Sequence, residues 1–305
     1  HRNIARRMME NFPEVFSGRA HIDARSTTVA RCIISMGAAM QYMANTNPEL
    51  QISINASKRD IWFMNHQDTV LRNNAMSPVA KKAYDAYREQ LVKNPRLMEV
   101  LFTNPDSASK VVSISEKWIN YYLLKTALIQ QNTHMIDSTR FIDFFTTDDI
   151  HKFWQVENAW WYILHGATTL NGAHQPYSQR YLLKKMIAEA DSCIRLERPG
   201  AQLRYGHETV LLPLVCLIGI NGFDLQTDHL EELEARGWMA SKVFPMGSNV
   251  QFVFYRRDIG DEDVVFKVLL NEHEATLPIP TDMAPYYRWD DFRTYCLEKI
   301  LTVYP

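Results

Sequence analysis

Hydrophobic and polar positions in the first part of the chain follow the period of a helix, then of a strand, then of a helix again. The segment Asn3–Phe12 is basic and amphipathic, and Pro13 limits it, so the pattern predicts a short surface helix. Ala20–Arg25 is extended and is followed by Ser26–Thr28, a run of residues that favours the N-cap of a helix. The helix expected next carries one apolar stripe with helical spacing, formed by Val29, Cys32, Ile33, Met36, Met40 and Met43.

A second strand is expected at Leu50–Ile54, where apolar and polar residues alternate. A strand, a crossover helix and another strand are typical of a parallel sheet with helices on its faces. From about Lys58 to Pro199 the pattern changes to successive helices, expected at Val79–Val92, Pro95–Phe102, Ile114–Gln130, Asp148–Gly166 and Tyr177–Arg195. The aromatic residues of Asp148–Gly166 have helical spacing, which favours a place in the core over a ligand site.

The last third of the chain returns to alternating strands and helices. The expected elements are strands at Ala201–Tyr205, Asn249–Tyr255 and Val264–Leu270, and helices at Val210–Ile220 and Asp290–Leu301. We therefore predict an α/β fold with a mostly parallel sheet flanked by helices and an inserted α-helical cap domain. Residues 1–57 and 201–305 would form the α/β core, and residues 58–200 would form the cap.

Composition narrows the class of protein without naming a function. Of the 305 residues, 46% are hydrophobic and 22% are charged, which is typical of a globular protein. The 33 lysines and arginines nearly balance the 35 aspartates and glutamates, so the net charge of −2 gives no reason to expect a nucleic-acid partner. The longest apolar run, Val210–Ile220, contains Pro213 and is too short to span a membrane. The opening His1–Arg7 has no apolar stretch that resembles a secretory signal.

The four cysteines, Cys32, Cys193, Cys216 and Cys296, are scattered and form no Cys-x-x-Cys motif. Cys32 and Cys216 lie in apolar helical patterns, so we expect buried free thiols there, while the pattern predicts no particular disulfide pairing. No spacing of histidines and carboxylates is typical of a metal site, and we expect no metal and no organic cofactor.

The first candidate for chemistry is Arg31, near the start of the helix that follows the first strand. In an open α/β sheet, binding sites collect where strands end and helices begin. A guanidinium there adds fixed charge to the free N–H groups of the helix start, which suits a phosphate or a carboxylate. The alternative is a solvated or ion-paired arginine on the helix surface.

The second candidate is His207 with Glu208, between the strand Ala201–Tyr205 and the apolar helix after it. An imidazolium can hold a phosphoryl oxygen, and the adjacent carboxyl can deliver a proton to a leaving oxygen. The alternative makes Glu208 a carboxylate favoured by the helix dipole and His207 a hydrogen-bonded loop residue.

Both junctions resemble conserved blocks of the histidine acid phosphatases, which are branch 2 of the histidine phosphatase superfamily. Arg25–Met36, with the sequence RSTTVARCIISM, is similar to the second block, particularly in the branch that contains multiple inositol polyphosphate phosphatases and bacterial phytases. Arg204–Thr209, with the sequence RYGHET, resembles the distal histidine block. Phe244–Asn249 and Val268–Glu272 resemble the closing region of the family.

The resemblance implies a role for each matching residue. Arg31 would clamp the phosphate, His207 would hydrogen-bond the phosphoryl group, and Glu208 would protonate the leaving alcohol. Many members have His-Asp or His-Ala-Glu at this point, whereas here a glutamate directly follows the histidine. The family's nucleophile is the histidine of an Arg-His-Gly-x-Arg motif, which this chain does not contain; its only His-Gly, His165-Gly166, follows Leu164 and does not match.

The resemblance therefore predicts a phosphomonoester hydrolase that acts on small phosphorylated substrates, inositol polyphosphates in particular, through a phosphohistidine whose nucleophile lies upstream of this chain. The alternative is a relative that binds phosphorylated ligands and has lost the nucleophile. The family implies a periplasmic or secreted location. A core without its first strand would leave backbone groups unpaired, so we expect the 305 residues alone to be poorly stable. Four basic residues of the expected cap are kept outside the site because such residues usually face solvent: His174, Arg180, Lys184 and Lys185.

Overall fold

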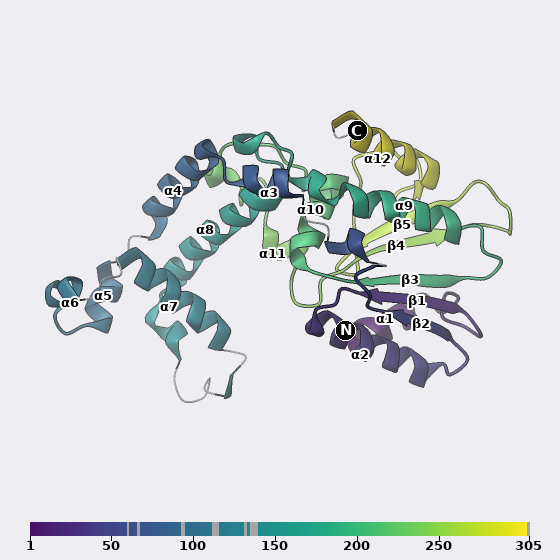
Figure 1. Cartoon of the computed structure of the whole chain (residues 1–305), viewed down its shortest axis with the longest axis horizontal. Coiled ribbons are helices and arrows are strands. Elements are labelled where there is room, and N and C mark those ends of the chain that lie inside the picture. Colours follow the sequence, from purple (N-terminus) through teal and green to yellow (C-terminus); the bar gives the residue numbers. More distant parts are fainter. Residues whose placement is uncertain are drawn as a thin grey trace.

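A computed structural model describes residues 1–59, 61–65, 68–92, 95–111, 116–130, 133–134 and 140–303. The chain begins with helix α1 (Arg2–Asn11), strand β1 (His21–Ser26), helix α2 (Ala30–Thr46) and strand β2 (Gln51–Asn55). These elements gather at one end of the molecule, and the helices α4 to α8 extend from the other end (Figure 1). The four elements expected in this first segment are confirmed.

Strands β1, β2 and β3 (Gly200–Tyr205) form a parallel sheet in the order β2-β1-β3. In its register, His21 pairs with Gly200, and Ser26 pairs with Tyr205. Gly200 is required at the start of β3, because a Cβ atom there would lie 2.5 Å from the carbonyl oxygen of His21. The pairing places the carboxyl ends of β1 and β3 side by side.

The two faces of this sheet differ in polarity. Ile22, Ala24, Leu203 and Tyr205 belong to an apolar cluster with α1 and α2. Because side chains alternate across a strand, the other face carries the polar side chains of β1 and β3, which are Asp23, Arg25, Gln202 and Arg204. Helix α9 (Arg180–Cys193) meets this polar face.

The middle of the chain is helical, as the sequence predicts. Its helices are α3 (Thr69–Ala75), α4 (Pro78–Val92), α5 (Pro95–Leu101), α6 (Pro105–Val111), α7 (Glu116–Gln130) and α8 (Thr147–His165). A capping box starts α8, because Thr146 accepts from the N–H of Asp149 and the Asp149 carboxylate accepts from the N–H of Thr146. Phe153 and Tyr162 of α8 are buried as expected, whereas Trp160 is exposed.

The last third begins with α10 (Glu208–Ile218), the apolar helix that the sequence predicts at Val210–Ile220. Strands β4 (Val250–Tyr255), β5 (Val265–Leu270), β6 (His273–Glu274) and β7 (Tyr287–Arg288) pair antiparallel in a second sheet. Helices α11 (Ala240–Val243) and α12 (Trp289–Val303) complete the fold. The α/β class is thus confirmed, with parallel pairing confined to β1, β2 and β3 among the described residues.

Gly219 ends α10 in a left-handed conformation, with φ of 84°. Its N–H bonds to the carbonyl of Val215, and a Cβ atom there would lie 2.9 Å from Cγ of Pro278. Glycine is therefore favoured twice at this helix end, by backbone conformation and by close packing. No helix among the described residues has the length and apolar character needed to cross a membrane.

Buried apolar residues form two separate clusters. The small cluster joins α1, α2, β1 and β2 and includes Ile22, Met36 and Met43. The large cluster joins the helices of the middle segment to α10, the antiparallel sheet and α12, and it includes Tyr162 and Phe266. The buried core of the helical segment is therefore continuous with that of the last third of the chain.

Two boundaries differ from the sequence-based expectations in a way that matters for the site, and a third falls outside the described residues. Ser26–Thr28 does not cap α2, because β1 continues through Ser26 and the N-cap is Val29, which has no side-chain cap. Helix α9 begins at Arg180, since Gln175–Gln179 forms a separate turn of 3-10 helix. Helix α7 is described from Glu116, and the start expected at Ile114 lies outside the described residues.

Candidate functional site

The candidate site lies where β1 and β3 end and where α2 and α10 begin. The N–H of Thr27, directly after β1, donates to the carbonyl of Tyr205 at 3.0 Å. This bond extends the β1–β3 pairing by one residue and holds the two chain segments together beyond the sheet. It brings the start of α2 to the start of α10, so residues from two distant parts of the sequence share one site.

Arg31 and His207 contact each other at this junction. Nη2 of Arg31 lies 3.1 Å from Nδ1 of His207, although 176 positions separate them in the sequence. His207 is the N-cap residue of α10, with extended backbone, and it is partly buried while Arg31 is exposed. The structure therefore brings together the two side chains that the sequence analysis assigned to phosphate binding.

The other ring nitrogen of His207 contacts Thr27, whose Oγ1 lies 3.1 Å from Nε2. On the Nδ1 side, the thiol of Cys32 donates to the carbonyl of Gly206, and its sulfur lies 3.9 Å from Nδ1. Burial lowers the pKa of His207, and the positive charge of Arg31 lowers it further, while the Glu208 carboxylate opposes both effects. The environment thus favours the neutral imidazole.

Glu208 is the first residue of α10 and is exposed. Its carboxylate makes no hydrogen bond or ion pair within the part of the chain that the structure describes. A carboxyl group beside a histidine at a helix start, with no partner of its own, is able to exchange a proton with a bound molecule.

His165, the last residue of α8, lies near enough to Glu208 for their charges to interact. Its ring stacks on Trp161 at 5.2 Å between centroids, and Trp161 in turn contacts Phe244 at 4.7 Å. Burial lowers the pKa of His165 to about 4, against a smaller opposite effect of Glu208. In the sequence, the residues that flank His165 do not match the nucleophile motif, and no spacing links it to Glu208.

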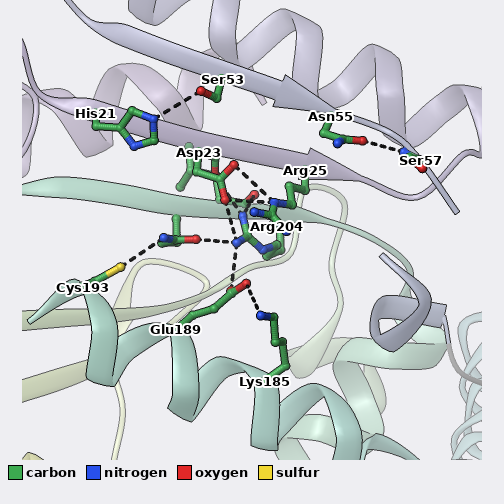
Figure 2. Close-up of polar contacts among 12 residues, drawn as sticks. His21, Asp23, Arg25, Ser53, Asn55, Ser57, Lys185, Glu189, Cys193 and Arg204 are labelled. Atoms are coloured by element: carbon green, nitrogen blue, oxygen red, sulfur yellow. Dashed lines mark hydrogen bonds and ion pairs between the residues drawn. The ribbon is translucent and has the colours of Figure 1, made fainter. Parts of the chain in front are cut away.

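A charged network lies on the polar face of the parallel sheet, next to the site (Figure 2). Nη2 of Arg204 lies 2.9 Å from Oδ2 of Asp23 and 2.9 Å from Oε2 of Glu189 on α9. Arg25 bonds to Asp23 through Nε, at 3.0 Å from Oδ2, and Lys185 lies 3.5 Å from Glu189. The alternation of polar residues in β1 and β3 could have pointed to this network, but the helix that supplies Glu189 was not foreseeable from it.

The four basic residues kept outside the site differ in their surroundings. Arg180 forms an ion pair with Asp68, the N-cap residue of α3, so its charge holds the fold together. Lys185 joins the charged network, whereas Lys184 and His174 are exposed. Of the four, Lys185 is the one that takes part in the charged network.

The segments of the closing region also meet one another. Asn271 accepts from the N–H of Asn249 and donates to the carbonyl of Lys242 at 2.9 Å. Asn271 and Glu272 both have positive φ, of 53° and 70°, so the chain turns sharply after β5. The turn directs Glu272 to Arg7 of α1.

All four cysteines are free thiols, and Cys32 and Cys216 are buried as expected. Within the described ranges, no group of three or more histidine, cysteine, aspartate and glutamate side chains is arranged to hold a metal ion.

Solved structures of phosphatases share this fold. The multiple inositol polyphosphate phosphatase of Bifidobacterium longum, in complex with inositol hexasulfate, gives a TM-score of 0.73 at 16% identity, over 97% of this chain and 77% of that chain. The same protein in complex with phosphate gives 0.74 at 15% identity, over 98% and 78%. The phytase from D. castellii gives 0.66 at 14% identity, over 98% of this chain and 62% of its own. A comparison with curated protein sequences gives no significant match.

The α/β fold of this chain is thus shared with solved structures of a multiple inositol polyphosphate phosphatase and a phytase. A model of the histidine phosphatase superfamily, branch 2, matches residues 1–271, and the chain belongs to this family. The resemblance inferred from the sequence blocks is confirmed.

Proposed function

We propose that this chain carries the phosphate-binding and proton-donating part of a phosphomonoester hydrolase. The observation that carries the proposal is the contact between Arg31 and His207, 3.1 Å apart at the meeting point of two strand ends and two helix starts. A fixed guanidinium beside an imidazole and a helix N-terminus is a receptor for a dianionic phosphoryl group. Membership of the histidine phosphatase superfamily supports this assignment.

In the proposed reaction, the nucleophile is a histidine on a segment that precedes His1. Its ring nitrogen attacks phosphorus and the bond from phosphorus to the leaving oxygen breaks, which gives a phosphohistidine and an alkoxide. Glu208 donates its proton to the alkoxide. Water then attacks phosphorus and gives a proton back to Glu208 while the bond from phosphorus to nitrogen breaks, releasing inorganic phosphate and the free histidine. Arg31 and a protonated His207 stabilise the charge that develops on the phosphoryl oxygens.

We propose inositol polyphosphates as the substrate class. The Bifidobacterium longum protein binds inositol hexasulfate, which carries several anionic groups on one ring, and its fold is shared by this chain. In the charged network, the basic residues Arg25, Lys185 and Arg204 outnumber the acidic residues Asp23 and Glu189. Among the described residues, Arg25 pairs with Asp23 through Nε, which leaves its Nη groups to bind a further phosphate of the substrate.

The test of the reaction uses the protein with its natural upstream segment. An intact mass above 35.5 kDa for the purified protein identifies that segment. His207→Ala is expected to abolish phosphate release from inositol hexakisphosphate without loss of the folded state, which circular dichroism checks. Full activity in this variant contradicts the assignment of His207. A protein of 35.5 kDa that folds cooperatively and binds phosphate without turnover supports the non-catalytic relative instead.

A second test separates phosphate binding from substrate choice. Arg31→Ala is expected to weaken the binding of inorganic phosphate by about 10-fold to 100-fold, because a charged hydrogen bond is lost. Arg25→Ala is expected to weaken inositol hexakisphosphate while inorganic phosphate binds as before. Arg19→Ala, which removes an exposed arginine from a loop before β1, is the matched control. Equal loss of both ligands in Arg25→Ala contradicts a role in substrate choice.

We further propose that residues 1–57 and 201–305 form the phosphatase core and that residues 58–200 form a cap over the substrate. A periplasmic or secreted location is proposed from the family alone.

A further inference from the structure

Thr27 is held more firmly than a loop residue at a strand end usually is. It is buried, with 2% of its surface exposed, and its N–H donates to the carbonyl of Tyr205. Its own carbonyl accepts from the hydroxyl of Ser26 at 2.9 Å, and Ser26 is fully buried. The backbone on both sides of the Thr27 side chain is therefore fixed by hydrogen bonds, and its hydroxyl points at Nε2 of His207.

The contacts of His207 determine where its proton lies. A guanidinium can only donate hydrogen bonds, so Nδ1 of His207 must accept from Nη2 of Arg31. The proton of the neutral ring is then on Nε2, and Nε2 donates it to Oγ1 of Thr27 at 3.1 Å. The thiol of Cys32 donates to the carbonyl of Gly206, so it does not compete for this arrangement.

We infer that Thr27 is a positioning residue, which holds His207 as the Nε2–H tautomer and thereby presents Nδ1 to Arg31 and to a bound anion. Its effect on ligand binding rests on the proposed phosphate site, whereas the tautomer itself does not. Oγ1 of Thr27 contacts Nε2 of the ring, and Nη2 of Arg31, at the start of α2, contacts Nδ1. The ring is thus held from both sides in one orientation.

This arrangement links anion binding to proton uptake. When an oxyanion binds, the guanidinium of Arg31 turns from Nδ1 to the anion, and Nδ1 takes a proton from water. The resulting imidazolium donates from Nδ1 to the anion and from Nε2 to Thr27. The charged groups around the ring act in opposite directions, because Arg31 on α2 disfavours the imidazolium while Glu208 on α10 and the anion favour it. Cys32 on α2 contacts the ring without adding charge.

The inference predicts a specific dependence of binding on pH. Between the pKa of His207 in the free protein and its higher pKa in the complex, the affinity for inorganic phosphate falls with rising pH, by up to tenfold for each pH unit, since one proton enters with the ligand. Without the Thr27 hydroxyl, Nε2–H loses its acceptor and only Arg31 favours this tautomer, so phosphate binding is expected to weaken by about tenfold.

The test compares Thr27→Val with Thr27→Ser, using Thr28→Val at the neighbouring exposed threonine as control. Nitrogen NMR of histidine-labelled protein, with the His207 signals assigned by His207→Gln, reads the tautomer without any ligand. We expect the Nε2–H form in the unsubstituted protein, in Thr27→Ser and in Thr28→Val, and a mixture of tautomers in Thr27→Val.

The same proteins are then titrated with inorganic phosphate between pH 5 and pH 8. An Nδ1–H tautomer in the unsubstituted protein, or an unchanged tautomer and pH profile in Thr27→Val, overturns the inference. If the tautomer changes as expected but none of the proteins binds phosphate, the positioning role of Thr27 stands and the proposed function fails. If Thr27→Val does not fold, Thr27→Ala and Thr27→Ser decide, because they differ in the hydroxyl group.

Discussion

Arg7 and Glu272 lie 265 positions apart in the sequence and form a two-point ion pair. Nε of Arg7 lies 3.0 Å from Oε1 of Glu272, and Nη2 lies 2.6 Å from Oε2. The pair joins α1 to the turn after β5. Helix α1 contributes to the small apolar cluster, and strand β5 contributes to the large one. The ion pair raises the pKa of Arg7, so the guanidinium stays charged at every pH of interest.

The geometry of this pair predicts a difference between arginine and lysine. Arg7→Lys keeps the charge but loses one of the two parallel hydrogen bonds, and Arg7→Ala loses both. Because the pair is partly solvated, we expect Arg7→Ala to lower the free energy of unfolding only slightly, with Arg7→Lys in between. Urea denaturation measures both. If the unsubstituted protein and both variants had the same free energy of unfolding, the ion pair would not contribute to stability.

The charged network on the polar face of the sheet predicts a larger effect. Arg204, Asp23 and Glu189 expose 12–14% of their side chains, so removing one partner leaves a buried charge incompletely compensated. Asp23→Ala is expected to destabilise the fold by about 3 kcal/mol.

Glu10→Ala is the matched control for this network, because Glu10 pairs with Arg6 on the exposed side of α1. Its loss is expected to change the free energy of unfolding by less than about 1 kcal/mol. Similar losses in Asp23→Ala and Glu10→Ala would mean that the network behaves as a surface ion pair.

His165 predicts how stability changes in acid. Its pKa falls to about 4 in the folded protein, below the ordinary value of 6.5 that it regains on unfolding. The unfolded chain therefore binds more protons between pH 6.5 and pH 4, and stability falls as the pH falls through this range. The loss amounts to about 3 kcal/mol and is complete below pH 4.

We expect His165→Gln to remove this part of the acid dependence, as measured by urea denaturation at pH 7, 5.5 and 4. His21→Gln, at an exposed histidine, should leave the slope in place. An unchanged slope in His165→Gln would show that His165 does not stay neutral through its burial.

Two glycines at the end of α10 allow the cost of steric contact to be separated from the cost of a left-handed backbone conformation. Gly219 and Gly222 both have positive φ, of 84° and 74°, but only a Cβ atom at Gly219 would meet neighbouring atoms within 4 Å. Gly222→Ala should therefore cost about 1 kcal/mol for the backbone conformation, and Gly219→Ala about 3 kcal/mol. Thermal unfolding compares the two, and equal midpoints would show that Pro278 moves aside without cost.

The sequence predicts well those elements that have a strong local pattern of hydrophobic and polar residues. The apolar run of α10 and the alternation in β1 each place an element within two residues of its observed bounds. The helix cap predicted at Ser26–Thr28 is wrong: serine and threonine favour caps locally, but the N-cap of α2 is Val29. The pairing of β1 with β3, in which Ser26 lies opposite Tyr205, extends the strand and turns Thr27 toward His207 instead.

The residues of the candidate site were likewise only partly predictable from the sequence. Arg31 and His207 could be paired in advance because each lies in a block that resembles one family. The contacts of Thr27 and His165 could not be predicted in this way. Thr27 lies in a run of residues typical of a helix cap, and the position of His165 depends on where α8 ends relative to α10. In the sequence, Asp23 and Arg204 are recognisable only as polar positions in strands. Their partner Glu189 lies on a helix, and no local sequence pattern predicts where that helix packs.

The separation of the apolar residues into two clusters has a mechanical consequence. The chain leaves β3, which packs on the small cluster, and enters α10, at the centre of the large one, within Gly206 and His207. His207 therefore lies in the short segment between the two apolar clusters, and its ring contacts Thr27 and Arg31, which lie next to the small cluster. A change in the angle between β3 and α10 would turn the imidazole relative to Arg31, so a ligand bound to both side chains would oppose such a change.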